Sequence, residues 1–132
     1  DVMIDFATLT GAIMVALGRE YAGLYANDDA LAEQIVSAGQ TVGEKIWRMP
    51  LDEAFDKQIN TPRADMKNVG PRWGGSITAA QFLQRFINDV PWAHMDMAGV
   101  AWSDKELPLM AKGAAGFAVR AMDQFVRDNY EN

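Results

Sequence analysis

The sequence predicts an α/β fold, a three-layer αβα arrangement around a mainly parallel sheet. Short apolar segments typical of strands alternate with longer segments whose apolar residues recur at the helical period. The chain opens with such a strand, and a tight turn leads from it directly into a helix. Strands that alternate with helices favour a parallel sheet covered on both faces. Because only about three strands are recognisable, we expect the sheet in this chain to be incomplete.

The composition argues against several classes of protein. The 132 residues, 49% of them hydrophobic, suffice for one domain with a core. A net charge of −6 and the lack of adjacent Lys or Arg residues disfavour nucleic acid as a partner. No apolar run is long enough for a membrane span, and the absence of cysteine favours a reducing cytoplasm. Because Asp1 leads directly into a strand that reads as buried, we expect the C-terminal part of a longer protein.

The order of predicted elements is β-α-β-α-loop-α-β-α. They are strands at 2–7, 21–26 and 93–98, and helices at 12–17, 30–46, 77–88 and 114–129. The first strand is an apolar run interrupted only by Asp5, which is typical of a strand buried on both faces. Each long helix carries an apolar stripe; that of 30–46 runs through Leu31, Ile35, Ala38, Val42 and Ile46. Ser76 is expected to be the N-cap of the helix at 77–88.

Residues 47–71 have little periodicity. One or two helical turns are expected near 51–56, and the rest reads as turn or loop. A long irregular segment inside a compact domain is usually a functional or interface loop.

The turn Thr8-Leu9-Thr10-Gly11 is the first candidate for a binding site. It follows the first strand and precedes a helix, which is where parallel sheets bind ligands. Gly11 would let a ligand or a second backbone come close. The alternative is a purely structural turn.

Two further patterns allow a functional and a structural interpretation. His94 and Asp96 lie on one face of a strand and could contribute to a metal site, or they could be a hydrogen-bonded pair of buried polar residues. Gly74-Gly75-Ser76 precedes a helix and could bind an anion, or could serve close packing and capping. No serine has the G-x-S-x-G context of a nucleophile.

Three blocks of the sequence resemble, in order, the motifs of the leucyl (cytosol) aminopeptidase family. Residues 4–12 are similar to I-D-x-A-T-L-T-G-A. Residues 64–83 resemble A-D-x-x-N-x-G-x-R-x-G-G-S-I-T-A-A-x-F-L, and residues 92–99 resemble W-A-H-L-D-I-A-G. Together the blocks cover nearly the whole chain in the family's spacing. The resemblance implies that residues 1–132 are the C-terminal portion of the family's catalytic domain.

The resemblance also implies an activity. The family releases the N-terminal residue of peptides, typically with Leu-type preference, by hydrolysis with two divalent metals such as manganese, zinc or magnesium. Its N-T-D-A-E-G-R-L motif, which carries two acidic metal ligands and the catalytic arginine, is absent from this sequence. The remaining ligands and the catalytic lysine lie further upstream in the family. We therefore expect no catalytic residue and no metal ligand in this chain, which alone should be inactive.

By the same resemblance, the chain supplies a wall of the substrate pocket. The implied substrate-binding residues are Thr8, Leu9, Gly11, Ala98 and Ala101. The backbone at Leu9 would contact the substrate and lie beside a bicarbonate proposed as general base. The two alanines would leave room for a leucine or methionine side chain.

Members of the family are usually cytoplasmic homo-hexamers, so the 47–71 segment is a candidate subunit interface. Two departures from the family pattern, Pro71 and the segment 113–120, put subunit contacts in doubt more than activity. Two alternatives stay open: a non-catalytic α/β scaffold or interaction module, and an unrelated domain that binds phosphate at residues 74–76. We expect the isolated chain to fold only marginally, because its first strand would expose an unpaired edge.

Overall fold

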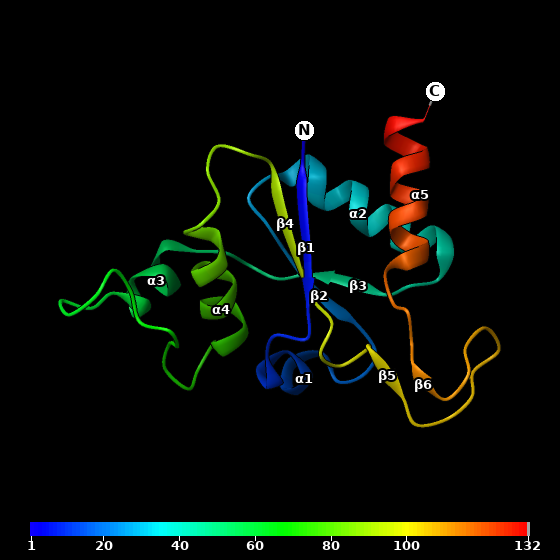
Figure 1. Cartoon of the computed structure of the whole chain (residues 1–132), viewed down its shortest axis with the longest axis horizontal. Helices are drawn as coiled ribbons and strands as arrows, with labels where there is room; N and C mark the ends of the chain where they lie inside the picture. The colour runs from blue at the N-terminus through cyan, green and yellow to red at the C-terminus, as the bar shows by residue number, and fades with distance from the viewer. Residues whose placement is uncertain (132) are drawn as a thin grey trace.

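The computed structural model describes residues 1–131 and confirms the α/β fold. Its main sheet has the strand order β1-β4-β2-β3 (Figure 1). The strands are β1 (Met3–Ala7), β2 (Ala22–Ala26), β3 (Ile46–Arg48) and β4 (Trp92–Asp96). The pairs β1–β4 and β2–β3 are parallel, whereas β2 and β4 run antiparallel. The sheet is therefore mostly parallel, as predicted, with one reversal that the sequence did not indicate.

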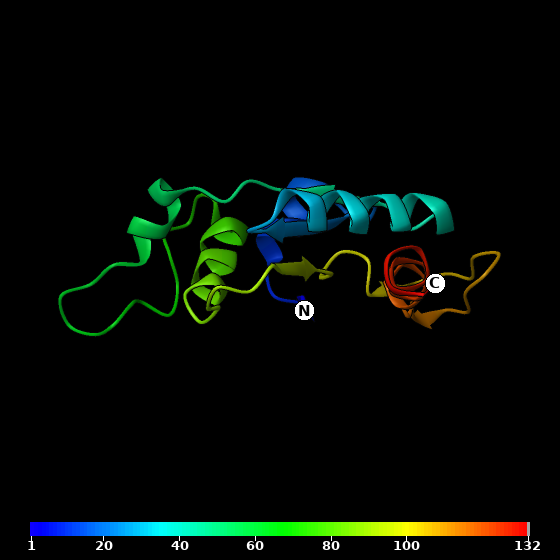
Figure 2. The same ribbon diagram turned by 90° about the horizontal axis from the view of Figure 1, so that it is seen from above.

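Helices cover both faces of this sheet. They are α1 (Gly11–Leu17), α2 (Asp29–Val42), α3 (Glu53–Asp56), α4 (Gly75–Gln84) and α5 (Val119–Tyr130), with a 3₁₀ turn η1 (Lys57–Ile59) after α3. α2 and α5 lie on one side of the strands, and α3 and α4 lie on the other (Figures 1 and 2). α1 packs on the side of α4, where Ile13 occupies the space in front of Gly23 of β2. The arrangement is a three-layer αβα fold.

Alternation along the strands divides the buried residues between the two faces. Leu24 and Met95 point toward α2 and α5 and belong to the larger apolar core. Tyr25 points the other way, toward Ile77 and Ala80 of α4. The polar residues of β4 lie on this second face, so the sheet separates the apolar core from a layer of buried polar groups.

The end of α2 and both ends of α4 differ from the prediction. The helix predicted at 30–46 ends at Val42, because Gly43 adopts a left-handed conformation with φ of 74°. Ile46 belongs instead to β3, an extra strand, yet it still packs in the core beside α2. α4 ends at Gln84, four residues earlier than predicted. Its N-cap is Gly74, so the prediction of Ser76 as N-cap was wrong.

The last helix begins later than predicted. Residues 113–114 form β6 and pair with β5 (Trp102–Ser103) in a small antiparallel hairpin. α5 then starts at Val119, and Ala118 at its N-cap has no side-chain oxygen to accept a hydrogen bond. Glu44, which follows α2, accepts the N–H of Ala121 at 3.0 Å and fills that role from a distant part of the sequence.

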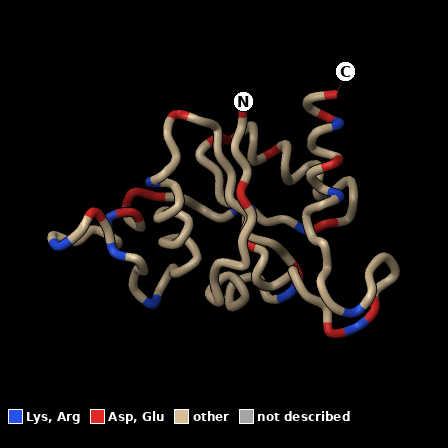
Figure 3. The backbone as a smooth tube through the Cα atoms, viewed as in Figure 1, with Lys and Arg blue, Asp and Glu red and all other residues tan. Residues whose placement is uncertain are grey.

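β1 lies at an edge of the sheet, and the prediction that it is buried on both faces was wrong. Met3 is 46% exposed and Phe6 is 39% exposed. The irregular segment before α4 extends away from the sheet and carries Arg63, Lys67 and Arg72 (Figures 1 and 3). Within residues 1–131, no helix is long and apolar enough to cross a bilayer.

Candidate functional site

Two turns lie side by side at the C-terminal ends of β1 and β4. β1 and β4 are parallel neighbours, so the turns that follow them leave the sheet at the same end. The first turn, residues 8–11, leads into α1, and the second, residues 97–101, leads toward β5. The N–H of Met97 donates to the carbonyl of Ala7 at 2.8 Å, which extends the pairing of the strands to the base of the turns.

Asp96, the last residue of β4, binds both turns. Its Oδ1 accepts the N–H of Leu9 at 3.0 Å, that of Thr10 at 3.4 Å and that of Ala98 at 3.3 Å. Its Oδ2 accepts the hydroxyl of Thr10 at 2.7 Å. The Thr10 oxygen in turn accepts the N–H of Ile13 at 3.1 Å and caps α1. The carboxylate is thus the hub of the polar contacts at this end of the sheet.

The sequence-predicted site residues all lie on these two turns. Thr8, Leu9 and Gly11 are exposed, and Ala98 and Ala101 are partly buried. Leu9 presents 40% of its surface to solvent. A Cβ at Gly11 would meet nothing within 4 Å, so the space in front of this residue is open. Their role in substrate binding stays a prediction.

His94 and Asp96 are both buried, as the structural interpretation expects, but they do not bind each other as a pair: His94 binds Asp5, whereas Asp96 binds the two turns. The Nδ1 of His94 lies 2.5 Å from Asp5 Oδ1, and the indole N–H of Trp92 donates to Asp5 Oδ2 at 2.6 Å. These bonds cross from β4 to β1 at the middle of the strands. Within residues 1–131, no three His, Asp or Glu side chains are grouped so that they could hold a metal ion.

The other ring nitrogen of His94, Nε2, is buried and has no hydrogen-bond partner in the described part of the chain, and the same holds for the hydroxyl of Tyr25. The rings of His94 and Tyr25 stack with their centroids 6.0 Å apart. Burial raises the pKa of Tyr25 to about 12, and the nearby Ser76 hydroxyl opposes the rise without the geometry of a hydrogen bond. Tyr25 therefore stays a neutral phenol at physiological pH.

Comparison with known proteins identifies the fold family. A sequence model of the cytosol aminopeptidase family, catalytic domain, matches residues 1–122. The chain belongs to the cytosol aminopeptidase family. It is similar to the probable cytosol aminopeptidase of Methylorubrum populi, with 58% identity over 98% of this chain and 26% of that protein. The counterpart in Sinorhizobium medicae is 57% identical over 100% of this chain and 27% of that protein.

Two solved structures agree with the fold. A mutant of tomato leucine aminopeptidase superposes with a TM-score of 0.88 and 46% identity, over 96% of this chain and 24% of that one. The bottromycin maturation enzyme BotP superposes with a TM-score of 0.94 and 37% identity, over 100% of this chain and 30% of that one. The chain thus spans about a quarter of the length of the curated relatives it matches.

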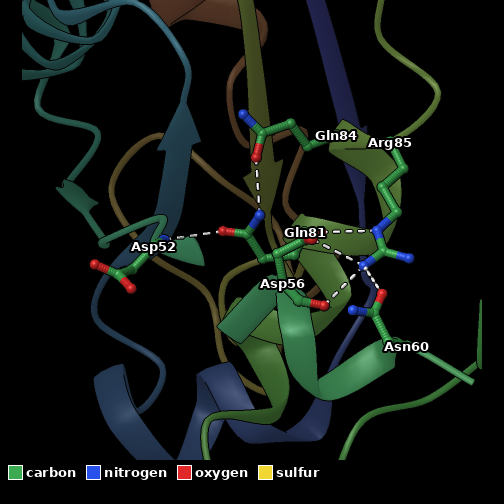
Figure 4. Close-up of polar contacts among 6 residues, drawn as sticks. All are labelled: Asp52, Asp56, Asn60, Gln81, Gln84 and Arg85. Atoms are coloured by element: carbon green, nitrogen blue, oxygen red, sulfur yellow. Dashed lines mark hydrogen bonds and ion pairs between the residues drawn. The ribbon is translucent and has the colours of Figure 1, made fainter. Parts of the chain in front are cut away.

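A second polar cluster, which the sequence did not predict, lies on the far side of α4 (Figure 4). The guanidinium of Arg85 donates to both carboxylate oxygens of Asp56, at 2.7 and 2.8 Å, and to Asn60 at 2.7 Å. Gln81 accepts the N–H of Asp52 at 3.0 Å and donates to Gln84 at 2.9 Å. These contacts fasten α3 and η1 to α4. The partners that join α3 and η1 to α4 are 25 to 29 residues apart, so no local pattern could have revealed these contacts.

This cluster predicts a pH-dependent contribution to stability. Hydrogen bonds and charge from Arg85 hold the pKa of Asp56 below its usual value, against a smaller opposing effect of burial. The ionised pair therefore stabilises the fold fully above about pH 4, and this is lost as the pH falls through the lowered pKa. We expect Asp56→Asn to lower the free energy of unfolding by about 1–2 kcal/mol at pH 7. Urea unfolding at pH 7 and pH 3 should show that the difference from wild type shrinks at pH 3.

The matched control is Asp123→Asn. Asp123 pairs with Arg127 at 3.0 Å, but both side chains are more than half exposed. We expect this variant to match wild type at both pH values. An Asp56→Asn deficit that is the same at pH 3 and pH 7 would contradict the assignment.

Proposed function

We propose that this chain forms the substrate-facing wall of a metal-dependent aminopeptidase that releases N-terminal residues, with Leu-type preference, from peptides. The observation that carries the proposal is the pair of adjacent turns held by Asp96, in a chain of the cytosol aminopeptidase family. On this proposal, residues 1–132 are the C-terminal portion of the catalytic domain. Relatives about four times as long, named as aminopeptidases, support it.

We infer that this chain supplies no metal ligand, and the contacts of its buried polar residues support this. Asp96 is committed to four donors and His94 to Asp5, and residues 1–131 hold no cluster that could bind a metal. We propose that two divalent ions, manganese, zinc or magnesium, are bound by other parts of the full-length protein. When bound, they would activate a water and stabilise the oxyanion.

The chain's contribution is to bind and orient the peptide. Gly11 is exposed at the first position of α1, where backbone N–H groups have no partner inside the helix. Such a group suits the carbonyl of a peptide. The N–H of Leu9 is already donated to Asp96, so a bicarbonate beside Leu9 would need other donors. Ala98 and Ala101, both small, would leave space for an aliphatic first side chain.

Further features suit the assembly that the family resemblance implies. β1 presents a free backbone edge and half-exposed apolar side chains, which another strand of the full-length protein could cover. The projecting basic segment before α4, with Trp73 75% exposed, suits a subunit contact in a homo-hexamer.

We propose a cytoplasmic enzyme, in line with the relatives' name.

The test is an assay of the full-length protein on leucine p-nitroanilide. We expect release of p-nitroaniline with added Mn²⁺, loss of release with a chelator, and none from residues 1–132 alone. A full-length protein without activity under any divalent metal would overturn the enzyme and leave a non-catalytic α/β scaffold or interaction module. Phosphate affinity lost in Ser76→Ala would instead favour an anion site at residues 74–76.

A further inference from the structure

Asp96 is a buried carboxylate at the end of a strand. It is 1% exposed and stands at the boundary between a strand and the turn that follows. A buried carboxylate is costly unless hydrogen bonds replace its lost water. Here three backbone N–H groups and one hydroxyl do so. The burial of this carboxylate therefore depends on these four donors.

The donors come from two segments far apart in the sequence. Leu9 and Thr10 belong to the turn after β1, and Ala98 belongs to the turn after β4. Oδ1 accepts the N–H groups of Leu9 and Ala98 at the same time, so one oxygen atom links the two turns. Oδ2 adds a bond to the hydroxyl of Thr10, which also caps α1. Displacing the carboxylate would release both turns together.

Other contacts hold the base of the turns but not their tips. The Met97–Ala7 hydrogen bond extends the strand pairing. Gly99 lies against the backbone of Gly18 at the far end of α1. Neither contact joins the residues that the proposed function assigns to the two sides of the substrate pocket. The hydrogen bonds of Asp96 do.

We propose that Asp96 is a positioning residue that holds the two walls of the substrate pocket in register and so determines how strictly the first side chain of the peptide is selected. The inference rests on the proposed function. Asp96 touches no substrate in this role and acts through the backbone of Leu9 and Ala98. A carboxylate is suited to this because both of its oxygens accept, whereas an amide accepts through one oxygen only.

The test compares two substrates in the same enzyme preparation. We measure kcat/KM of the full-length, Mn²⁺-loaded protein and its Asp96→Asn variant on leucine and alanine p-nitroanilides. The ratio of the two values does not depend on the fraction of enzyme that is folded, so a purely structural defect leaves it unchanged. We expect the leucine-to-alanine ratio to fall by about tenfold in Asp96→Asn, because the apolar contacts to the longer side chain are lost when the walls separate.

The matched control is Asp5→Asn. Asp5 is a carboxylate on the same face of the sheet, but its bonds to Trp92 and His94 stay between the strands. We expect Asp5→Asn to lower thermal stability while the leucine-to-alanine ratio stays at the wild-type value. An Asp96→Asn ratio equal to that of wild type, or an Asp5→Asn ratio that falls equally, would overturn the proposal.

Thr10 provides a second test if Asp96→Asn does not fold. Thr10→Val removes the hydroxyl that binds Oδ2, whereas Thr10→Ser keeps it. We expect the ratio to fall in Thr10→Val by about threefold and to be restored in Thr10→Ser. Equal ratios in both variants would overturn the proposal.

Failure of the proposed function can be told apart from failure of this inference. An inactive wild-type protein overturns both the enzyme and the selective role of Asp96. An active wild-type protein whose selectivity ignores Asp96 and Thr10 overturns the inference alone. Amide hydrogen exchange at Leu9 and Thr10, which needs no activity, should rise at least about tenfold in Asp96→Asn if the carboxylate holds the turn.

Discussion

Ala98→Phe is expected to lower kcat/KM of the full-length protein for leucine p-nitroanilide by about 100-fold. Ala98 follows β4 and is held by its N–H to Asp96, so its backbone cannot easily retreat from a larger side chain. A phenyl group there would occupy space that the proposed function assigns to the first side chain of the peptide. The alanine anilide needs less space, and its kcat/KM should change by less than about threefold, which reverses the preference.

The control for this substitution is Ala111→Phe. Ala111 is exposed between β5 and β6, away from both turns, so the same change in volume should leave both substrates unaffected. Thermal unfolding of each variant shows whether the protein remains folded. If the two substrates lose kcat/KM equally in Ala98→Phe, Ala98 does not line the pocket for the first side chain.

Gly99→Ala is expected to lower the free energy of unfolding by about 3 kcal/mol or more. A Cβ on Gly99 would lie 2.2 Å from the carbonyl oxygen of Gly18. This neighbour is a backbone atom at the end of α1 and cannot rotate away like a side chain. The turn after β4 and the end of α1 would have to separate, and the turn carries Ala98 and Ala101. Urea unfolding followed by tryptophan fluorescence measures the loss.

Gly11→Ala is the matched glycine control. A Cβ at Gly11 meets nothing within 4 Å, and the residue is the first of α1. Alanine should therefore leave the stability unchanged or raise it slightly. Comparable losses of stability in the two variants would show that the contact between Gly99 and Gly18 is not what fixes the turn.

The sequence alone determined which segments become strands and helices where local patterns are strong. The apolar stripe of α2, the short apolar strands β2 and β4, and the turn from β1 into α1 were all visible in it. It also determined the family, because three motifs stand in order along the chain. These features depend on residues that are close in sequence, such as the spacing of apolar side chains on one helix face.

Tertiary structure alone decided the rest. β2 runs antiparallel to β4, and Ile46 forms part of β3 instead of the helix before it. Both features depend on hydrogen bonds to strands that are far apart in the sequence. The same is true of the Arg85–Asp56 cluster and of Glu44 at the start of α5. Asp96 was visible in the sequence only as one half of a buried polar pair. Leu9 and Asp96 are 87 residues apart in the sequence, and their link arises because β1 and β4, the strands before the two turns, are neighbours in the folded sheet.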